Sequence, residues 1–214
     1  VIPRCVRLEP RSVGEARDAL ASLGFEPPLL LRPAGRHGGD ELTLVASAND
    51  WQRLERFPFD GRPYYATEFV DFRSPDGLYR RHRFLGVGDR IIARQLIAAT
   101  SWNIHSASRG ELMDDRPDLR DEERQFLATG DRAYEAPLRA IADYFGVDCS
   151  IDGDGRMVVF EVNACFRPVG GGNPNPNYAY LRPYADEILD AFHALIHAKV
   201  AGDRGPKRPR ETMP

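Results

Sequence analysis

The sequence predicts an α+β fold built from antiparallel strands and amphipathic helices. Residues 64–97 contain three runs rich in aromatic and β-branched side chains, separated by short turns, which indicates an antiparallel meander. Residues 145–151 and 158–164 are strand-like runs that flank a turn sequence at residues 152–156, which indicates a β-hairpin. Apolar residues recur at helical spacing over residues 184–199 and predict a final amphipathic helix.

The composition is that of a globular protein and argues against several classes. The chain has 214 residues, of which 42% are hydrophobic and 29% charged, and its net charge is −3. Such a balance gives no global basic field for nucleic acid. The three cysteines show no CxxC spacing, and no apolar run approaches the ~20 residues of a membrane span. We therefore expect a cytoplasmic protein, with neither nucleic acid nor membrane as a partner.

The first third of the chain predicts a helix followed by two strands around a glycine-rich turn. Ser12 is placed to cap a helix over residues 13–23. A buried strand over residues 27–33 carries Arg32 near its end. Three glycines within residues 34–40 then make a turn whose backbone N–H groups can approach an anion. A returning strand over residues 43–46 and a short helix around residues 51–56 complete this part.

The second half predicts helices before and after the hairpin. Residues 119–130 and 133–145 are expected to form two helices, since the second stretch places apolar residues on one face. Residues 170–177 are a loop by their glycine, asparagine and proline content. The basic, proline-rich tail at residues 200–214 is expected to be disordered.

The hairpin carries a candidate metal site. Glu161 and Asn163 lie two residues apart on a predicted strand, so their side chains share a face. The turn would bring Asp148 beside them. Two carboxylates and an amide oxygen suit Mg²⁺, which prefers oxygen ligands. The alternative interpretation is a surface hairpin with solvated acids.

The order of these features resembles the ATP-grasp superfamily. The residues that carry the resemblance are 29–39, 68–70, 146–148 and 160–164, and the likeness extends over about residues 3–199. Within this superfamily the sequence is similar to ribosomal-protein glutamate ligases and glutathione-synthetase-like enzymes. The resemblance implies two α+β lobes with antiparallel sheets that clasp a nucleotide, a glycine-loop lobe at about residues 1–67 and a metal-binding lobe at about residues 68–199. It also implies an upstream domain that this chain does not contain.

The resemblance further implies ATP and Mg²⁺ as cofactors and assigns residues to them. Asp148, Glu161 and Asn163 match metal ligands. Arg83 matches an arginine that meets the acyl phosphate or substrate, and Arg94 lies near the family's next basic position. The residues that match nucleotide-binding positions are Arg32, Gly35, His37, Gly38, Gly39, Glu68, Phe69, Val70 and Asn103.

The implied activity is ATP-dependent ligation of a carboxylate to an amine or thiol through an acyl phosphate, with small-molecule or peptide substrates. Two alternatives stay open. One is an ATP-grasp kinase that phosphorylates a small molecule. The other is a non-catalytic nucleotide-binding or interaction module of a larger protein, which the replacement of the family's usual lysine by Arg32 favours. Arginine still binds phosphate, but as a fork rather than a point charge.

Overall fold

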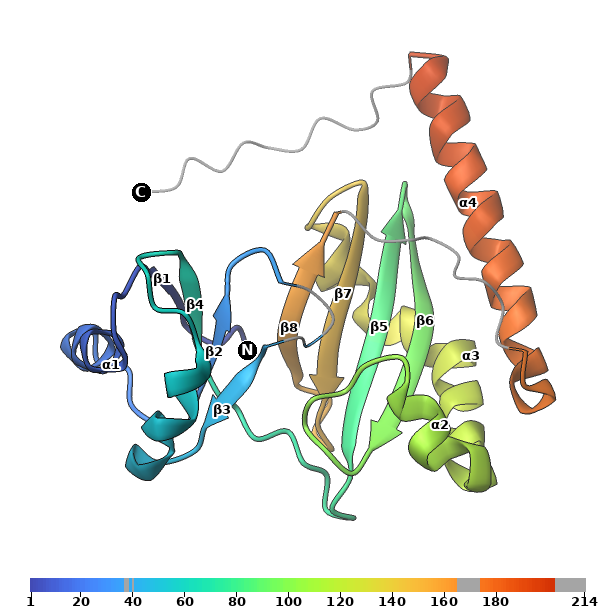
Figure 1. Ribbon diagram of the computed structural model, residues 1–214. Helices are drawn as coiled ribbons and strands as arrows, with labels where there is room; N and C mark the ends of the chain where they lie inside the picture. The colour runs from blue at the N-terminus through green and yellow to red at the C-terminus, as the bar shows by residue number, and fades with distance from the viewer. Residues whose placement is uncertain (37–38, 40, 165–173, 203–214) are drawn as a thin grey trace. The chain divides into compact units, whose positions relative to one another are not determined.

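The computed structural model describes residues 1–36, 39, 41–164 and 174–202 (Figure 1). The strands form two four-stranded sheets, with strand orders β1-β4-β2-β3 and β6-β5-β7-β8. Helical segments lie between some of the strands along the chain. The predicted α+β class is confirmed. The described chain divides into two compact units. The first comprises the described residues within 1–81, 97–117 and 149–160, and the second comprises those within 82–96, 118–148 and 161–214.

The first sheet is antiparallel throughout and packs on two helical segments. Its strands are β1 (Cys5–Leu8), β2 (Leu29–Pro33), β3 (Thr43–Val45) and β4 (Tyr64–Glu68), and its helical segments are α1 (Val13–Ser22) and the 3-10 helix η1 (Ala48–Arg56). Alternate residues of β2 are buried, and Leu29 and Leu31 are 0% exposed in a core that includes Leu54 of η1. Burial of these side chains contributes about 2 kcal/mol each.

The predicted cap of the first helix is confirmed. The Ser12 hydroxyl accepts a hydrogen bond from the Glu15 N–H at 3.1 Å, which satisfies one of the first N–H groups of α1. Gly24 follows the helix with φ +69°, a left-handed conformation that glycine adopts without strain.

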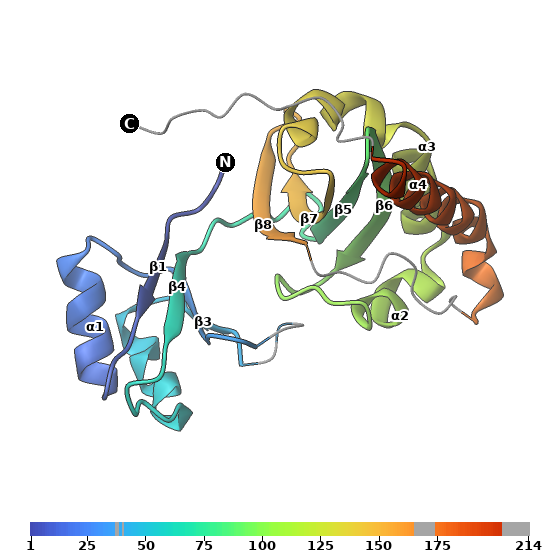
Figure 2. The ribbon, with the colours of Figure 1, turned by 90° about the horizontal axis from the view of Figure 1, so that it is seen from above.

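The second sheet is formed by β5 (Tyr79–Val87), β6 (Arg90–Ala99), β7 (Tyr144–Ile151) and β8 (Met157–Asn163). The remaining helical segments are α2 (Ser108–Leu112), η2 (Met113–Asp115), α3 (Pro117–Arg139), η3 (Pro176–Leu181) and α4 (Arg182–Val200). The helices α3 and α4 can be followed beside β5 and β6 in Figure 2.

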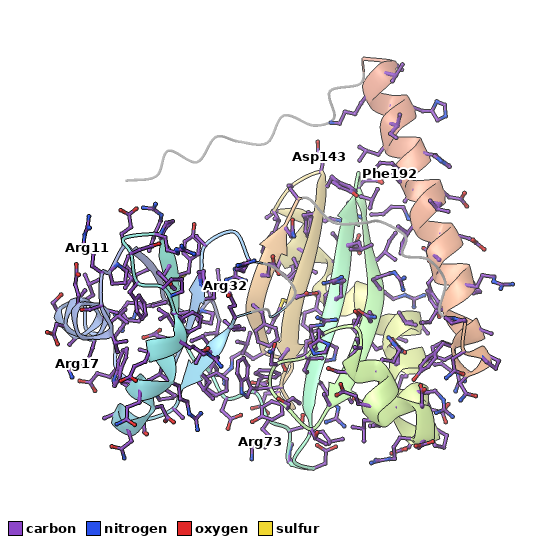
Figure 3. The ribbon with its side chains drawn as sticks, in the orientation of Figure 1. Arg11, Arg17, Arg32, Arg73, Asp143 and Phe192 are labelled. Carbon is purple, nitrogen blue, oxygen red and sulfur yellow. The ribbon has the colours of Figure 1, made fainter. Side chains whose placement is uncertain are left out.

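Alternate residues of β5 contact different helices. His82 and Phe84 pack edge-on against Phe126 of α3, with ring centroids 4.9 and 5.2 Å away. Leu85 and Val87 share a buried cluster with α4. Since the side chains of a strand alternate between its faces, Phe84 and Leu85 point to opposite faces of β5. Phe192 extends this cluster from α4 towards Tyr144, at a centroid distance of 5.5 Å (Figure 3).

The prediction of a helix over residues 133–145 is confirmed as far as Arg139 and is wrong beyond it. The helix α3 runs unbroken from Pro117 to Arg139, and β7 begins at Tyr144. The Tyr144 ring packs against Phe192 on α4, and the Phe145 ring packs against the backbone of Gly86 on β5. Packing of these rings outweighs a helical pattern that rested on a few small residues. The first of the three strand-like runs within residues 64–97 forms a strand that ends at Glu68.

Gly86 is expected to tolerate no side chain. A Cβ at this position would lie 2.1 Å from the Phe145 ring, whereas a Cβ at Gly153 in the hairpin turn would meet nothing within 4 Å. We expect Gly86→Ala to lower the free energy of unfolding by about 1–3 kcal/mol through overpacking, measured by urea denaturation. Gly153→Ala is the matched control and should change it by less than about 0.5 kcal/mol. Equal effects of the two substitutions would contradict the packing of Phe145 on Gly86.

Candidate functional site

The predicted nucleotide-binding residues that are described all lie in the first unit. Arg32 projects from β2 (Figure 3), where it lies opposite Tyr65 of β4 and is partly buried. Gly35 and Gly39 in the following turn have φ values of +80° and +82°, which L side chains rarely adopt. His37 and Gly38 lie outside the described residues.

The glycine turn packs against the loop that follows β6. A Cβ built on Gly39 would lie 2.7 Å from Oδ1 and 3.2 Å from Nδ2 of Asn103. The turn backbone therefore approaches the amide of Asn103 as closely as a glycine permits. Two segments that were assigned separately to nucleotide binding, Gly39 and Asn103, are neighbours.

The segment of residues 68–70 is fixed by contacts to the start of the chain. Arg4 donates to the Glu68 carboxylate from Nε at 2.7 Å and from its backbone N–H at 3.1 Å, and these bonds lower the pKa of Glu68. The Glu68 N–H donates to the Arg4 carbonyl at 3.0 Å, and the Phe69 N–H donates to the Pro28 carbonyl at 3.1 Å. The Glu68 side chain is thus engaged with Arg4.

Trp102 is a site residue that the sequence interpretation missed. Its ring lies edge-on to Phe69, with centroids 5.7 Å apart and an interplanar angle of 76°. It precedes Asn103 directly, so one loop contacts both residues 68–70 and the glycine turn. The one sequence feature that could have indicated a role for Trp102 is that it directly precedes Asn103, which was assigned to nucleotide binding.

Trp102 also forms one wall of a cavity of about 590 Å³. The cavity is lined by Leu42, Thr43, Leu44, Arg53, Arg56 and Trp102. Arg56 donates from Nη2 to the Thr43 hydroxyl at 2.8 Å, which holds its guanidinium at the cavity wall. Arg53 is paired with Asp50 at 3.1 Å, and Arg56 lies beside apolar side chains, which suits an anionic ligand that carries an apolar body.

The predicted catalytic and metal-binding residues lie in the second unit, and two of them form an ion pair. Arg83 on β5 donates to Asp148 on β7 from Nε to Oδ1 at 2.6 Å and from Nη2 to Oδ2 at 2.5 Å. The Asp148 side chain is 10% exposed and the Arg83 side chain 37% exposed. The hydrogen bonds to Asp148 raise the pKa of Arg83, and the charge of Glu161 acts in the same direction.

The other members of the predicted set lie on β8 and β6. Glu161 and Asn163 lie near the end of β8, where Asn163 Nδ2 donates to Glu161 Oε1 at 3.5 Å. Both side chains therefore share one side of the strand, as predicted. Arg94 is partly buried on β6.

The donor set fits a hard divalent cation. The described residues contain no cluster of three or more His, Cys, Asp or Glu side chains that could hold a metal ion. The predicted set is different in kind, with two carboxylates and one amide, and all of its donors are the oxygen atoms that Mg²⁺ prefers. The Arg83 guanidinium is hydrogen-bonded to Asp148, and the charge of Glu161 also acts on it, so this part of the unit already holds a positive charge.

Comparisons with solved structures show the class of fold. An N5-carboxyaminoimidazole ribonucleotide synthetase in complex with ADP is 12% identical over 91% of this chain and 48% of its own, with a TM-score of 0.50. An N5-carboxyaminoimidazole synthase from Aspergillus clavatus with ADP and 5-aminoimidazole ribonucleotide is 16% identical over 91% and 47%, also at 0.50. The ATP-grasp ligase PsnB with a minimal precursor, Mg and ADP is 19% identical over 90% and 54%, at 0.41.

The chain therefore has the ATP-grasp fold, as its sequence predicted. It spans about half the length of the solved chains that it matches. No protein-family model matches the chain, and the search of curated proteins gave no match. None of the described helices is long and apolar enough to cross a membrane.

Proposed function

We propose that this protein is an ATP- and Mg²⁺-dependent ligase that joins a carboxylate to an amine or a thiol. The observation that carries the proposal is the pair Arg83–Asp148 with Glu161 beside it, in a chain that has the ATP-grasp fold. The similar synthetase and synthase structures hold ADP, and the PsnB structure holds Mg and ADP. The contact between Gly39 and Asn103 supplies a second, independent support.

The proposed reaction has two steps that balance in atoms and charge. An oxygen of the substrate carboxylate attacks the γ-phosphorus of ATP, the bond to the β-phosphate oxygen breaks, and ADP leaves. The resulting acyl phosphate is attacked at its carbonyl carbon by an amine or thiol, which loses a proton, and inorganic phosphate leaves. Mg²⁺, when bound, supplies neutralisation of the phosphate charge.

Each residue of the site has a proposed role in this reaction. Asp148, Glu161 and Asn163 would hold the metal, and Arg83 with Arg94 would stabilise the charge that develops on the transferred group. The nucleotide would be held by the other predicted residues, namely Arg32, Gly35, His37, Gly38, Gly39, Glu68, Phe69, Val70 and Asn103. Because Glu68 is tied to Arg4 through its side chain, we assign the backbone of residues 68–70 to the adenine edge.

The position of the cavity supports its use by an anionic substrate. Arg53 and Arg56 provide positive charge, and Trp102 provides an apolar wall next to Asn103. We propose that a carboxylate substrate with an apolar body enters here. Recognition of the acceptor would involve a further domain, since the chain spans about half of the similar structures.

A thermal-shift measurement with ATP and Mg²⁺ tests the proposal. A ligand at 100 times its dissociation constant stabilises the folded state by about 2.7 kcal/mol, so the melting temperature should rise by about 5–10 °C. Glu161→Ala should remove most of this rise. Asp154→Ala, which removes an exposed acid in the turn of the same hairpin, should keep it.

The outcomes separate the candidate functions. No stabilisation by MgATP would exclude both the ligase and the kinase. Stabilisation with ADP release that depends on an added amine supports the ligase. ADP release with a hydroxyl substrate alone supports the kinase, and stabilisation without any turnover supports the non-catalytic module.

A further inference from the structure

The carboxylate of Asp148 already has a cationic partner in the structure. Both of its oxygens accept hydrogen bonds from one guanidinium, at 2.6 and 2.5 Å, in the parallel geometry that makes arginine–carboxylate pairs strong. The Asp148 side chain is only 10% exposed. Burial of a carboxylate is costly unless a positive charge is paired with it.

A divalent cation at Asp148 would compete with this partner. Mg²⁺ binds carboxylate oxygens at about 2.0–2.1 Å, and both Asp148 oxygens already accept from Arg83, so the two cations would share one carboxylate. Two positive charges at one carboxylate repel each other strongly in a poorly solvated site. The charge of Glu161 attracts Arg83 as well, so a cation that binds both carboxylates takes over both negative charges that act on the guanidinium.

Of the two partners, Arg83 is the one able to leave. Its side chain is 37% exposed against 10% for Asp148, and it is long and flexible. The guanidinium can therefore turn towards solvent while Asp148 stays in β7.

We infer that Arg83 stands in for the metal cation in the metal-free protein and leaves Asp148 when a divalent cation binds. The inference rests on the proposed metal-binding role of Asp148. It assigns Arg83 a positioning role before any chemistry, since the guanidinium becomes free to meet the transferred phosphoryl group only in the metal-loaded site. Arg83, which is proposed to act in group transfer, thereby stays bound to Asp148 until the metal is present.

Direct metal titration tests this without turnover. Mn²⁺ is the probe, added to the whole chain without nucleotide, and free Mn²⁺ is measured by electron paramagnetic resonance. We expect Arg83→Gln to bind Mn²⁺ at least tenfold more tightly than the wild type, since the competing cation is gone. Arg83→Lys, which keeps the charge but loses the bidentate contact, should fall between the two.

Two controls place the effect at this site. Arg90→Gln removes another arginine–carboxylate pair of the same unit, with Glu187, and should leave Mn²⁺ affinity unchanged. Asp148→Asn in the Arg83→Gln background should abolish the tight binding. Equal Mn²⁺ affinity in wild type and Arg83→Gln would overturn the inference while leaving the proposed metal site standing. Absence of Mn²⁺ binding in every variant would overturn both.

A measurement on the unmodified protein guards against misfolding of the variants. The Nε–H of Arg83 is hydrogen-bonded to Asp148, so its nuclear magnetic resonance signal should be shifted and protected from solvent exchange. Addition of MgCl₂ should move this signal and speed its exchange. A signal that stays unchanged at saturating Mg²⁺ would show that Arg83 does not leave.

Discussion

Replacing Asp148 by alanine is expected to lower the free energy of unfolding by about 3 kcal/mol. Loss of one member of a buried ion pair leaves the other charge without compensation, at a typical cost of about 3–5 kcal/mol. The lower end applies here because the Arg83 side chain is 37% exposed and water partly replaces the lost partner. Urea denaturation at neutral pH measures the change.

A second aspartate provides the matched control. Asp143 pairs with Lys199 at 2.8 Å, but the two side chains are 51% and 45% exposed (Figure 3). Asp143→Ala should cost less than about 1 kcal/mol, as is usual for exposed pairs. If both substitutions cost the same, Asp148 is not held in the buried pair that the structure describes.

Removal of both charges should recover part of the loss. In a double variant with Arg83→Gln and Asp148→Asn, no charge is left uncompensated in the buried site. We expect the double variant to be more stable than the sum of the single effects predicts, by about 1–2 kcal/mol. Strict additivity would indicate that the two side chains act independently.

Features that depend on neighbouring residues were predictable from the sequence. The Ser12 cap, the glycine positions with positive φ and the hairpin turn at residues 152–156 are each encoded within a few residues. The alternation of buried residues in β2 follows from a local pattern too. The α+β class and the order of strands along the chain could be inferred from such signals, because each is decided by short-range chemistry.

Features that depend on distant partners were not predictable. Tyr144 and Phe145 belong to β7 rather than to a helix because their rings pack against Phe192 and Gly86, respectively. Trp102 gained a role only when Phe69 was found against it. Nothing in the local sequence of these residues indicates those partners.

The candidate site divides along the same line. Glu161 and Asn163 are two residues apart, so their side chains were predicted to share one face of the strand. In the structure the two side chains are hydrogen-bonded. The pairing of Asp148 with Arg83 joins two different strands, and the sequence interpretation had given these residues separate roles. Their assignment as metal ligand and catalytic residue stays a prediction, as do the lobe boundaries at about residues 67 and 199.

Replacing Gly39 by alanine is expected to weaken MgATP binding at least tenfold, which corresponds to about 1.4 kcal/mol. The new Cβ would lie 2.7 Å from Oδ1 of Asn103, so either the turn or the Asn103 loop must shift. Both segments belong to the proposed nucleotide site. Isothermal titration calorimetry with MgATP measures the change.

A substitution at Gly35 separates the effect of backbone strain from the effect of the clash with Asn103. It has nearly the same φ as Gly39, +80° against +82°, but a Cβ there would meet nothing within 4 Å. Gly35→Ala therefore introduces the same left-handed strain, about 1 kcal/mol, without the clash. Its effect on MgATP affinity should be clearly smaller, and equal effects would mean that backbone strain alone is responsible.

The contact between the glycine turn and Asn103 can then be tested by removing the Asn103 side chain. Asn103→Ala deletes the amide atoms that the new Cβ would strike. Adding Gly39→Ala to Asn103→Ala should therefore cause little further loss of affinity, although the same substitution is costly in the wild type. This non-additivity is expected only if the glycine turn and the Asn103 loop pack directly against each other in the nucleotide-bound protein.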